Sequence, residues 1–295
     1  MSYSRLKFAL AVFCVGCSSQ VRIQPRPEIP VALWNAPQDR LWLEADSLFA
    51  LRLDAKEAVK AEKAFSKAAQ AQPGIPALLT EWSRACFVVG LYGGLDPEES
   101  QAYFRKGVAI GEGAMRLHPE YDHVLSETED RNEAVFLLNG PFVEAVYWTA
   151  ANEGRKLNAS DRYVRKSGTG KFSALVDFLL ANGETLHSGG AHRMAGALAY
   201  RRQDGDNKLG DYHFQRALAI DPGYAGNYLV QAEFKAASLG DKRSFVEILN
   251  RLVDQPPDSL ASLSPDDGLE RRRARYLLAH ADDLFPEKAT RADPK

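Results

Sequence analysis

The sequence predicts an all-α fold, in which pairs of helices joined by short turns pack as an α-α superhelix or bundle. From Asp39 onward apolar residues recur at helical spacing, as in Leu41, Ala45, Leu48 and Phe49, and no run alternates as a strand does. Apolar residues make up 45% of the chain, with ordinary charge content, which is enough for a substantial core.

A proline-terminated spacing recurs within the expected helices. It reads Phe65-x2-Ala68-x4-Pro73, Gly111-x2-Ala114-x4-Pro119 and Phe214-x2-Ala217-x4-Pro222, with a small residue four positions before each: Ala61, Gly107 and Gly210. This is the spacing of the second helix of a tetratricopeptide repeat, in which small residues let paired helices approach. A fourth, degenerate unit is expected from Tyr228 through Gly240 to Pro256. The unequal intervals make these repeats cryptic, and the alternative is an α-bundle whose Ala-rich helices end at prolines.

The N-terminus has the order of a bacterial lipoprotein signal. Two basic residues, an apolar run and a small residue precede Cys17: Arg5 and Lys7, then Phe8–Val15, then Gly16. The run is too short to persist as a membrane-spanning helix. Residues 14–17 resemble a lipobox, although Cys14 stands where Leu is usual. We expect residues 1–16 to be cleaved and Cys17 to be lipidated; the alternatives are a signal cleaved elsewhere and an uncleaved anchor.

The predicted helical domain spans residues 38–285 and is flanked by two irregular segments. Residues 17–37 contain several prolines and few periodic apolar positions, which indicates an extended tether. Residues 286–295 are polar and terminal, which indicates a frayed tail. Ser18, rather than Asp, follows the expected lipidated cysteine, which favours passage to the outer membrane with the domain facing the periplasm.

Charge and cysteine usage exclude several kinds of protein. The formal net charge of −2 becomes about −4 once the signal peptide leaves, so no basic excess recruits nucleic acid. Cys86 is the one thiol left in the expected mature chain, so no internal disulfide is predicted. It lies in an apolar helical stretch, which is typical of a buried, inert thiol.

No pattern indicates an enzyme, a cofactor site or a metal site. Gly168–Lys171 resembles part of a phosphate loop, but Arg165 stands where that loop requires Gly, and Phe172 replaces its hydroxyl. The segment is expected to be a flexible turn between helices. His187 and His192 flank a glycine pair without the companions that zinc needs. We expect the glycines to make a tight turn and His192 to cap or decorate the next helix.

Several segments resemble, in order, the T component associated with TRAP transporters, the TatT family. The matching stretches are Asn139–Asn152 (NGPFVEAVYWTAAN), Ser188–Ala197 (SGGAHRMAGA), Tyr212–Leu218 (YHFQRAL) and Phe245–Leu249 (FVEIL). The resemblance runs from about Asp39 to Phe285. It implies a periplasm-facing lipoprotein of cryptic tetratricopeptide repeats that forms a homotrimer with pores through its subunits. It also implies a periplasmic solute-binding protein as partner and an apolar ligand.

An aromatic cluster in the first of these stretches is the candidate ligand site. Adjacent Tyr147 and Trp148 point about 100° apart on a helix, so one is expected to pack while the other faces a groove or an interface. Trp148 and Asn152, one turn apart, are predicted to line a cavity with an apolar wall and an amide donor. The alternative is that all are ordinary core residues. The full set of candidate ligand-lining or pore-lining residues is Phe142, Tyr147, Trp148, Asn152, Gly190 and His192.

Two functional hypotheses follow. The first is a binding and scaffolding lipoprotein that engages a solute-binding protein of a TRAP-type transporter and an apolar solute. The second is a structural lipoprotein of another cell-envelope machine that binds no small ligand. An enzyme ranks well behind both, because no convergent acid, base or nucleophile stands out in the sequence.

Overall fold

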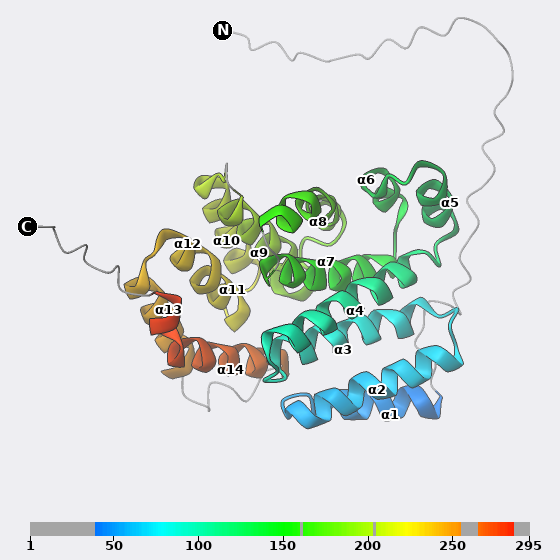
Figure 1. Cartoon of the computed structure of the whole chain (residues 1–295), viewed down its shortest axis with the longest axis horizontal. Coiled ribbons are helices and arrows are strands. Elements are labelled where there is room, and N and C mark those ends of the chain that lie inside the picture. Colours follow the sequence, from blue (N-terminus) through cyan, green and yellow to red (C-terminus); the bar gives the residue numbers. More distant parts are fainter. Residues whose placement is uncertain (1–38, 160–161, 203–204, 255–264, 286–295) are drawn as a thin grey trace, which may run out of the picture.

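The computed structural model describes residues 39–159, 162–202, 205–254 and 265–285, and every regular element within them is helical (Figure 1). The all-α prediction is confirmed. The predicted signal peptide, tether and tail lie outside the described residues. The helices are α1 (Arg40–Ala50), α2 (Ala55–Ala71), α3 (Pro76–Tyr92), α4 (Pro97–Met115), α5 (Pro119–Thr128), α6 (Arg131–Ala134), α7 (Phe142–Ala159), α8 (Arg162–Asn182), α9 (Leu186–Arg201), α10 (Asn207–Ile220), α11 (Ala225–Val230), α12 (Ala237–Leu239), α13 (Lys242–Asp254), α14 (Pro265–Ala279) and α15 (Ala281–Leu284), with a 3-10 turn at Val135–Leu137 and a π-helix at Gln231–Ala236.

Aspartate and proline define several helix starts. The side chains of Asp54, Asp96 and Asp206 accept backbone N–H groups in the first turns of α2, α4 and α10. Proline begins α3, α4 and α5, where the missing N–H has no intrahelical partner to lose. The prolines of the repeated spacing therefore stand at or just before the start of the next helix.

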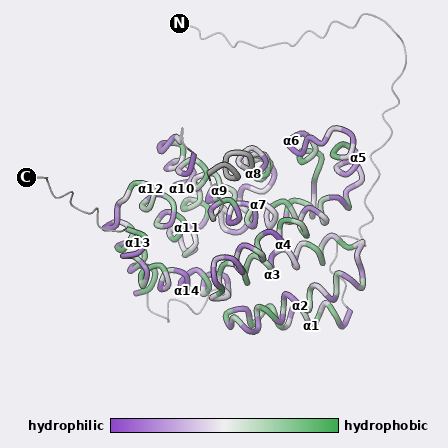
Figure 2. The backbone as a smooth tube through the Cα atoms, in the orientation of Figure 1, coloured by the Kyte–Doolittle hydropathy of each residue, from purple (hydrophilic) through white to green (hydrophobic). Residues whose placement is uncertain are grey.

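Helices α1 to α4 and α7 pack one on the next, and the short helices α5 and α6 project from this stack (Figure 1). Helices α8, α9 and α10 continue it, and α13 and α14 pack as a pair at the C-terminal end. Apolar and polar positions alternate around the long helices, as Figure 2 shows, so each buries one stripe. The largest apolar cluster joins α4, α7, α8 and α9 around Phe142 and Phe178.

The C-terminal helix α14 returns to contact α3, which closes the stack into a ring. Arg272 of α14 donates to the carbonyl oxygen of Tyr92 at 2.7 Å. Asp266, also on α14, pairs with Arg84 of α3 at 2.9 Å and with Arg52 at 2.9 Å. These polar contacts fix α14 over one end of a space that the other helices surround.

The small residues of the repeated spacing lie at helix contacts. Ala61 of α2 is fully buried. A Cβ on Gly107 of α4 would overlap the side chain of Asn152 in α7, and one on Gly210 of α10 would crowd Tyr200 in α9. The close approach that the spacing predicts therefore occurs in α4 and α10. The fourth unit also has a helix, a turn at Gly240 with φ of 67° and a second helix, α13, while Pro256 lies outside the described residues.

The prediction of a flexible turn at Gly168–Lys171 is wrong, because this segment lies inside α8. Each glycine in a helix interior costs about 1 kcal/mol relative to alanine, which is too little to end a helix that tertiary contacts hold. Phe172, next in sequence, is buried against the large apolar cluster and supplies such a contact.

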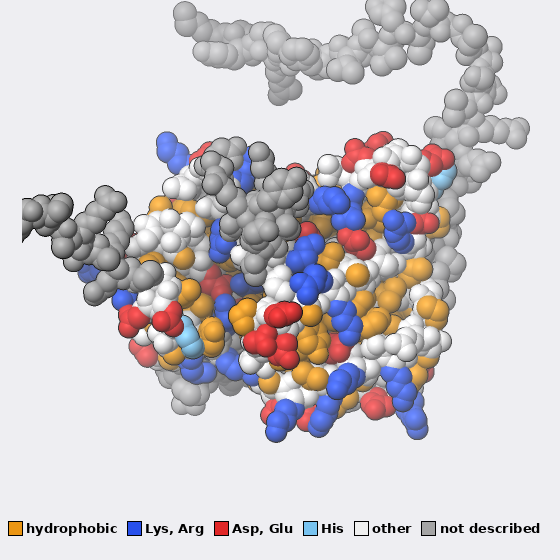
Figure 3. Space-filling model, viewed as in Figure 1, with side chains coloured by type: hydrophobic (Ala, Val, Ile, Leu, Met, Phe, Trp, Pro, Cys, Tyr) orange, Lys and Arg blue, Asp and Glu red, His pale blue; other side chains and the backbone are white. Residues whose placement is uncertain are grey.

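On the face shown in Figure 3, basic, acidic and apolar side chains intermingle. Large apolar side chains such as Phe136 and Leu209 are about half exposed. Within the described residues, no helix combines the length and apolarity needed to cross a membrane.

Replacing Gly107 with Ala should destabilise the protein by about 1–3 kcal/mol, because the new methyl group has to displace the buried Asn152 side chain. The matched control is Gly113→Ala in the same helix, where a Cβ meets nothing within 4 Å and should slightly stabilise the helix. Urea denaturation followed by circular dichroism measures both. Equal effects of the two changes would contradict the close contact between α4 and α7.

Candidate functional site

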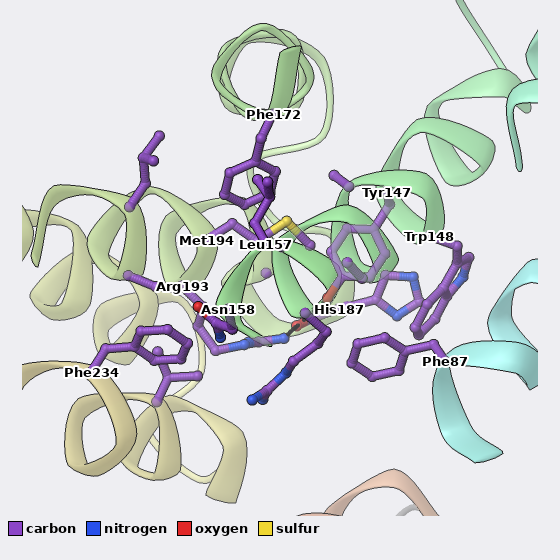
Figure 4. A pocket seen from close by; sticks show the side chains of 18 of the residues that line it. Phe87, Tyr147, Trp148, Leu157, Asn158, Phe172, His187, Arg193, Met194 and Phe234 are labelled. Atoms are coloured by element: carbon purple, nitrogen blue, oxygen red, sulfur yellow. Dashed lines mark hydrogen bonds between the residues drawn. The ribbon is translucent and has the colours of Figure 1, made fainter. Parts of the chain in front are cut away.

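A cavity of about 190 Å³ lies inside the ring, between α3, α7, α8, α9, the π-helix and α14. Figure 4 shows Phe172 reaching into it from α8, with Phe234 at one end and Phe87 and Trp148 at the other. Most of the wall is apolar. The apolar lining residues are Phe87, Val88, Trp148, Ala150, Ala151, Leu157, Phe172, Met194, Ala197, Leu198, Val230, Phe234 and Leu269.

Glycine at position 190 lets α9 approach α7 closely. A Cβ there would overlap the ring of Tyr147. Tyr147 in turn stands edge-on to Trp148, with ring centroids 4.9 Å apart, and both rings line the cavity. Both are also at most 6% exposed. The expectation that one ring packs and the other faces a groove is therefore wrong, since both pack and both reach the cavity from one helix.

Three successive residues at the start of α9 adopt a left-handed conformation. His187, Ser188 and Gly189 have φ angles of 47°, 58° and 81°. The first two carry side chains, and each costs about 1–3 kcal/mol in this region. Hydrogen bonds from Arg193 to the carbonyl oxygens of His187, at 2.7 Å, and Ser188, at 2.8 Å, offset the cost. The tight turn predicted near the glycines thus occurs at residues 187–189, one turn before Arg193.

The turn places His187 at the cavity wall. Its ring lies 4.1 Å from that of Tyr147, centroid to centroid, and its Nε2 lies 2.8 Å from a carboxylate oxygen of Glu144. Burial would raise the pKa of Glu144, but the hydrogen bond with His187 and the positive charges of His187 and Arg84 together outweigh burial, and the pKa is lowered. This polar pair borders the aromatic end of the cavity.

Two buried carboxylates near the cavity, Glu233 and Glu270, have different partners. Glu233, on the π-helix, is 3.0 Å from both Arg155 and Arg273. Burial would raise the pKa of Glu233, but the two guanidinium groups lower it to about 2. Glu270 on α14 instead accepts the hydroxyl of Tyr224 at 3.1 Å, and burial raises its pKa.

Three of the six predicted lining residues, Tyr147, Trp148 and Gly190, line this cavity. Phe142 is fully buried, edge-on to His118 at 5.2 Å. Asn152 is fully buried between α7 and α3, where its amide donates to the carbonyl oxygens of Ser83 and Trp148 at 3.0 and 2.9 Å. The predicted amide wall is therefore not supplied by Asn152, which serves helix packing.

His192 also lies away from the cavity. Its Nε2 is 2.9 Å from Glu184, and its Nδ1 is 2.8 Å from Nδ1 of His213 on α10. The expectation that it caps or decorates the surface of α9 is wrong, because the side chain is buried between two helices. No group of three or more potential metal ligands occurs in the described ranges. Cys86 is buried, and burial raises the pKa of its thiol, in keeping with an inert residue.

Sequence reasoning missed the charged residues of the cavity, including Arg155, Arg193 and Glu270. A signal was present for Arg193, because it is the one arginine in the stretch Gly189–Ala197, which otherwise holds glycine, alanine, methionine and His192. Such a residue is rarely buried without dedicated partners. Those partners come from distant segments that the sequence does not reveal.

Replacing Glu233 with Gln should lower the free energy of unfolding at pH 7 by about 3–5 kcal/mol, because two partly buried guanidinium groups lose the buried carboxylate that they share. A lowered pKa stabilises the fold above the unfolded-state value of about 4.3 and loses that contribution as pH falls toward 2. The gap between wild type and variant should thus shrink between pH 4.5 and 2.5 in urea titrations. Glu247→Gln, at an exposed pair with Arg251, is the control with little effect at any pH. A difference in stability that does not change with pH would contradict the lowered pKa of Glu233.

Comparison with family models matches residues 94–285 to the TRAP transporter T-component family. A search of curated proteins gave no match. The matched segment covers well over half of the chain and includes the cavity-lining parts of α7, α8, α9, the π-helix and α14. The resemblance noted from the sequence is confirmed, and the chain belongs to the TRAP transporter T-component family.

Proposed function

We propose that this T component binds an apolar solute in the cavity between α3, α7, α8, α9 and α14, and exchanges it with a periplasmic solute-binding protein. The family associates the protein with TRAP transport as an accessory component. The observation that carries the proposal is a preformed cavity with mainly aromatic and aliphatic walls, most of whose lining residues lie in the matched segment. An accessory role in transport and an apolar cavity both support a binding function.

The physical basis is transfer of apolar surface out of water. Each Å² of apolar surface buried contributes about 25 cal/mol, and rigid helices keep the cavity open without a ligand-induced ordering cost. Phe87, Phe172 and Phe234 come from three elements and supply the walls. A solute without strong polar groups therefore gains most from entering.

The proposal includes attachment to the membrane. Lipidation of Cys17 would hold the helical domain near the bilayer through residues 17–37, facing the periplasm and most simply from the outer membrane. Tethering raises the local concentration of both partners at the membrane, which favours a weak and rapidly exchanging contact. A homotrimer, as the family resemblance implies, would present several cavities to one partner.

Filling the cavity should abolish solute binding. Ala197 lines the wall on α9, and Ala197→Phe places a ring in the space. Binding of the apolar fluorescent probe N-phenyl-1-naphthylamine should fall at least tenfold, with helical circular dichroism retained. The matched control, Ala102→Phe on the exposed face of α4, should bind the probe like wild type. Equal binding by both variants would remove the cavity from the proposal.

The partner and the anchor are tested together in the native envelope. Wild-type protein should fractionate with membranes, and after mild detergent extraction it should co-purify as a trimer with a periplasmic solute-binding protein. Cys17→Ser removes the acceptor thiol, so the variant should leave the membrane fraction. Membrane retention of the variant would refute the anchor. A wild-type complex that holds other envelope proteins and no solute-binding protein would refute the partner.

A further inference from the structure

Arginine side chains outnumber carboxylates at the cavity wall. Among the described residues that line it are Arg155, Arg193, Arg201 and Arg202, against Asp266 and Glu270. Asp266 is already divided between Arg52 and Arg84, both at 2.9 Å. Arg155 is paired as well, with Glu233 at 3.0 Å, so the number of arginines alone is not a surplus of positive charge.

Arg193 is the buried member of this set. Its guanidinium donates to neutral acceptors: the carbonyl oxygens of His187 and Ser188, the amide oxygen of Asn227 at 2.8 Å and the hydroxyl of Tyr147 at 3.3 Å. No carboxylate of the described residues lies within 4.0 Å of it. The acceptors hold the group rigidly, and the carboxylate of Glu270, which acts on it electrostatically, stays outside pairing distance. A positive charge in a poorly solvated space attracts an anion.

The hydroxyl of Tyr147 links Arg193 to the cavity. Its oxygen accepts from Arg193, so its own proton is free to be donated elsewhere. Burial raises the pKa of Tyr147 despite the nearby guanidinium, which keeps that proton in place. A hydroxyl that accepts from a cation is a stronger donor than an isolated one. The donor stands beside the apolar wall of Trp148 and Phe87.

We infer that the solute is an amphipathic acid, such as a medium-chain carboxylate, whose anionic head accepts from the Tyr147 hydroxyl beside Arg193 and whose apolar body lies along Met194 and Phe172. The inference rests on the proposed function, since it names the class of solute for the same cavity. Glu270 opposes the head group, because it is the carboxylate of the wall that no described arginine pairs with inside 4.0 Å. Removing its charge strengthens the binding of an acid.

The test compares decanoate with 1-decanol at pH 7.5 as competitors of N-phenyl-1-naphthylamine on the full-length protein. The alcohol is the more apolar of the two, so an uncharged cavity prefers it. Decanoate is expected to displace the probe at a concentration at least tenfold lower than decanol. Equal displacement, or a preference for decanol, overturns the inference and leaves the proposed apolar site standing. Failure of the probe itself to bind wild type overturns the proposed function.

Two isosteric variants change the preference in opposite directions. Tyr147→Phe removes the donor and keeps the ring. The ratio of the decanol concentration to the decanoate concentration needed to displace the probe should therefore fall about tenfold. Glu270→Gln removes the opposing charge, so that ratio should rise. Tyr212→Phe, at an exposed tyrosine, is the control with an unchanged ratio. Variants that leave the ratio unchanged, with circular dichroism spectra like wild type, overturn the placement of the head group.

Discussion

The guanidinium of Arg193 binds three parts of the chain that are far apart in sequence. It closes the left-handed turn before α9, holds the hydroxyl of Tyr147 on α7 and contacts Asn227 on α11. Burying a guanidinium is costly unless its N–H groups find acceptors, and here four bonds supply them. Asn227 is itself fixed by donating to the carbonyl oxygens of Ala217 and Asp221. The cavity exists because these elements are held at set positions around one cation.

Other charged side chains near the cavity also join distant parts of the chain. Asp266 and Glu233 each join two arginines from different elements, so they link α14 and the π-helix to the earlier helices. Pairing of this kind leaves the wall polar at fixed points and apolar between them. Such a wall discriminates solutes by the position of their polar group more than by total size.

Much of the fold is encoded locally. The apolar periodicity, the aspartate caps and the proline starts each act within a few residues, so the helices and the small-residue contact at Gly107 are predictable. The site is less predictable from the sequence. Asn152 reads as a ligand donor until Ser83, 69 residues earlier in the chain, is seen to accept from it. The role of Arg193 becomes visible only when its acceptors on α7, α11 and the turn before α9 are assembled. Tyr147, Trp148 and Gly190 could be found because adjacent aromatic residues on a helix and a glycine pair are conspicuous in the sequence without their partners.

The π-helix at Gln231–Ala236 changes which side chains face the cavity. A π-turn holds one residue more than an α-turn, so the residues after it are rotated by about 100° relative to their places in an unbroken α-helix. Here the wider turn carries both Glu233, which faces Arg155, and Phe234, which faces the cavity. Removing one residue from this turn would present a different pair of side chains to Arg155 and to the cavity, so the lining can change through chain length with no substitution in the wall.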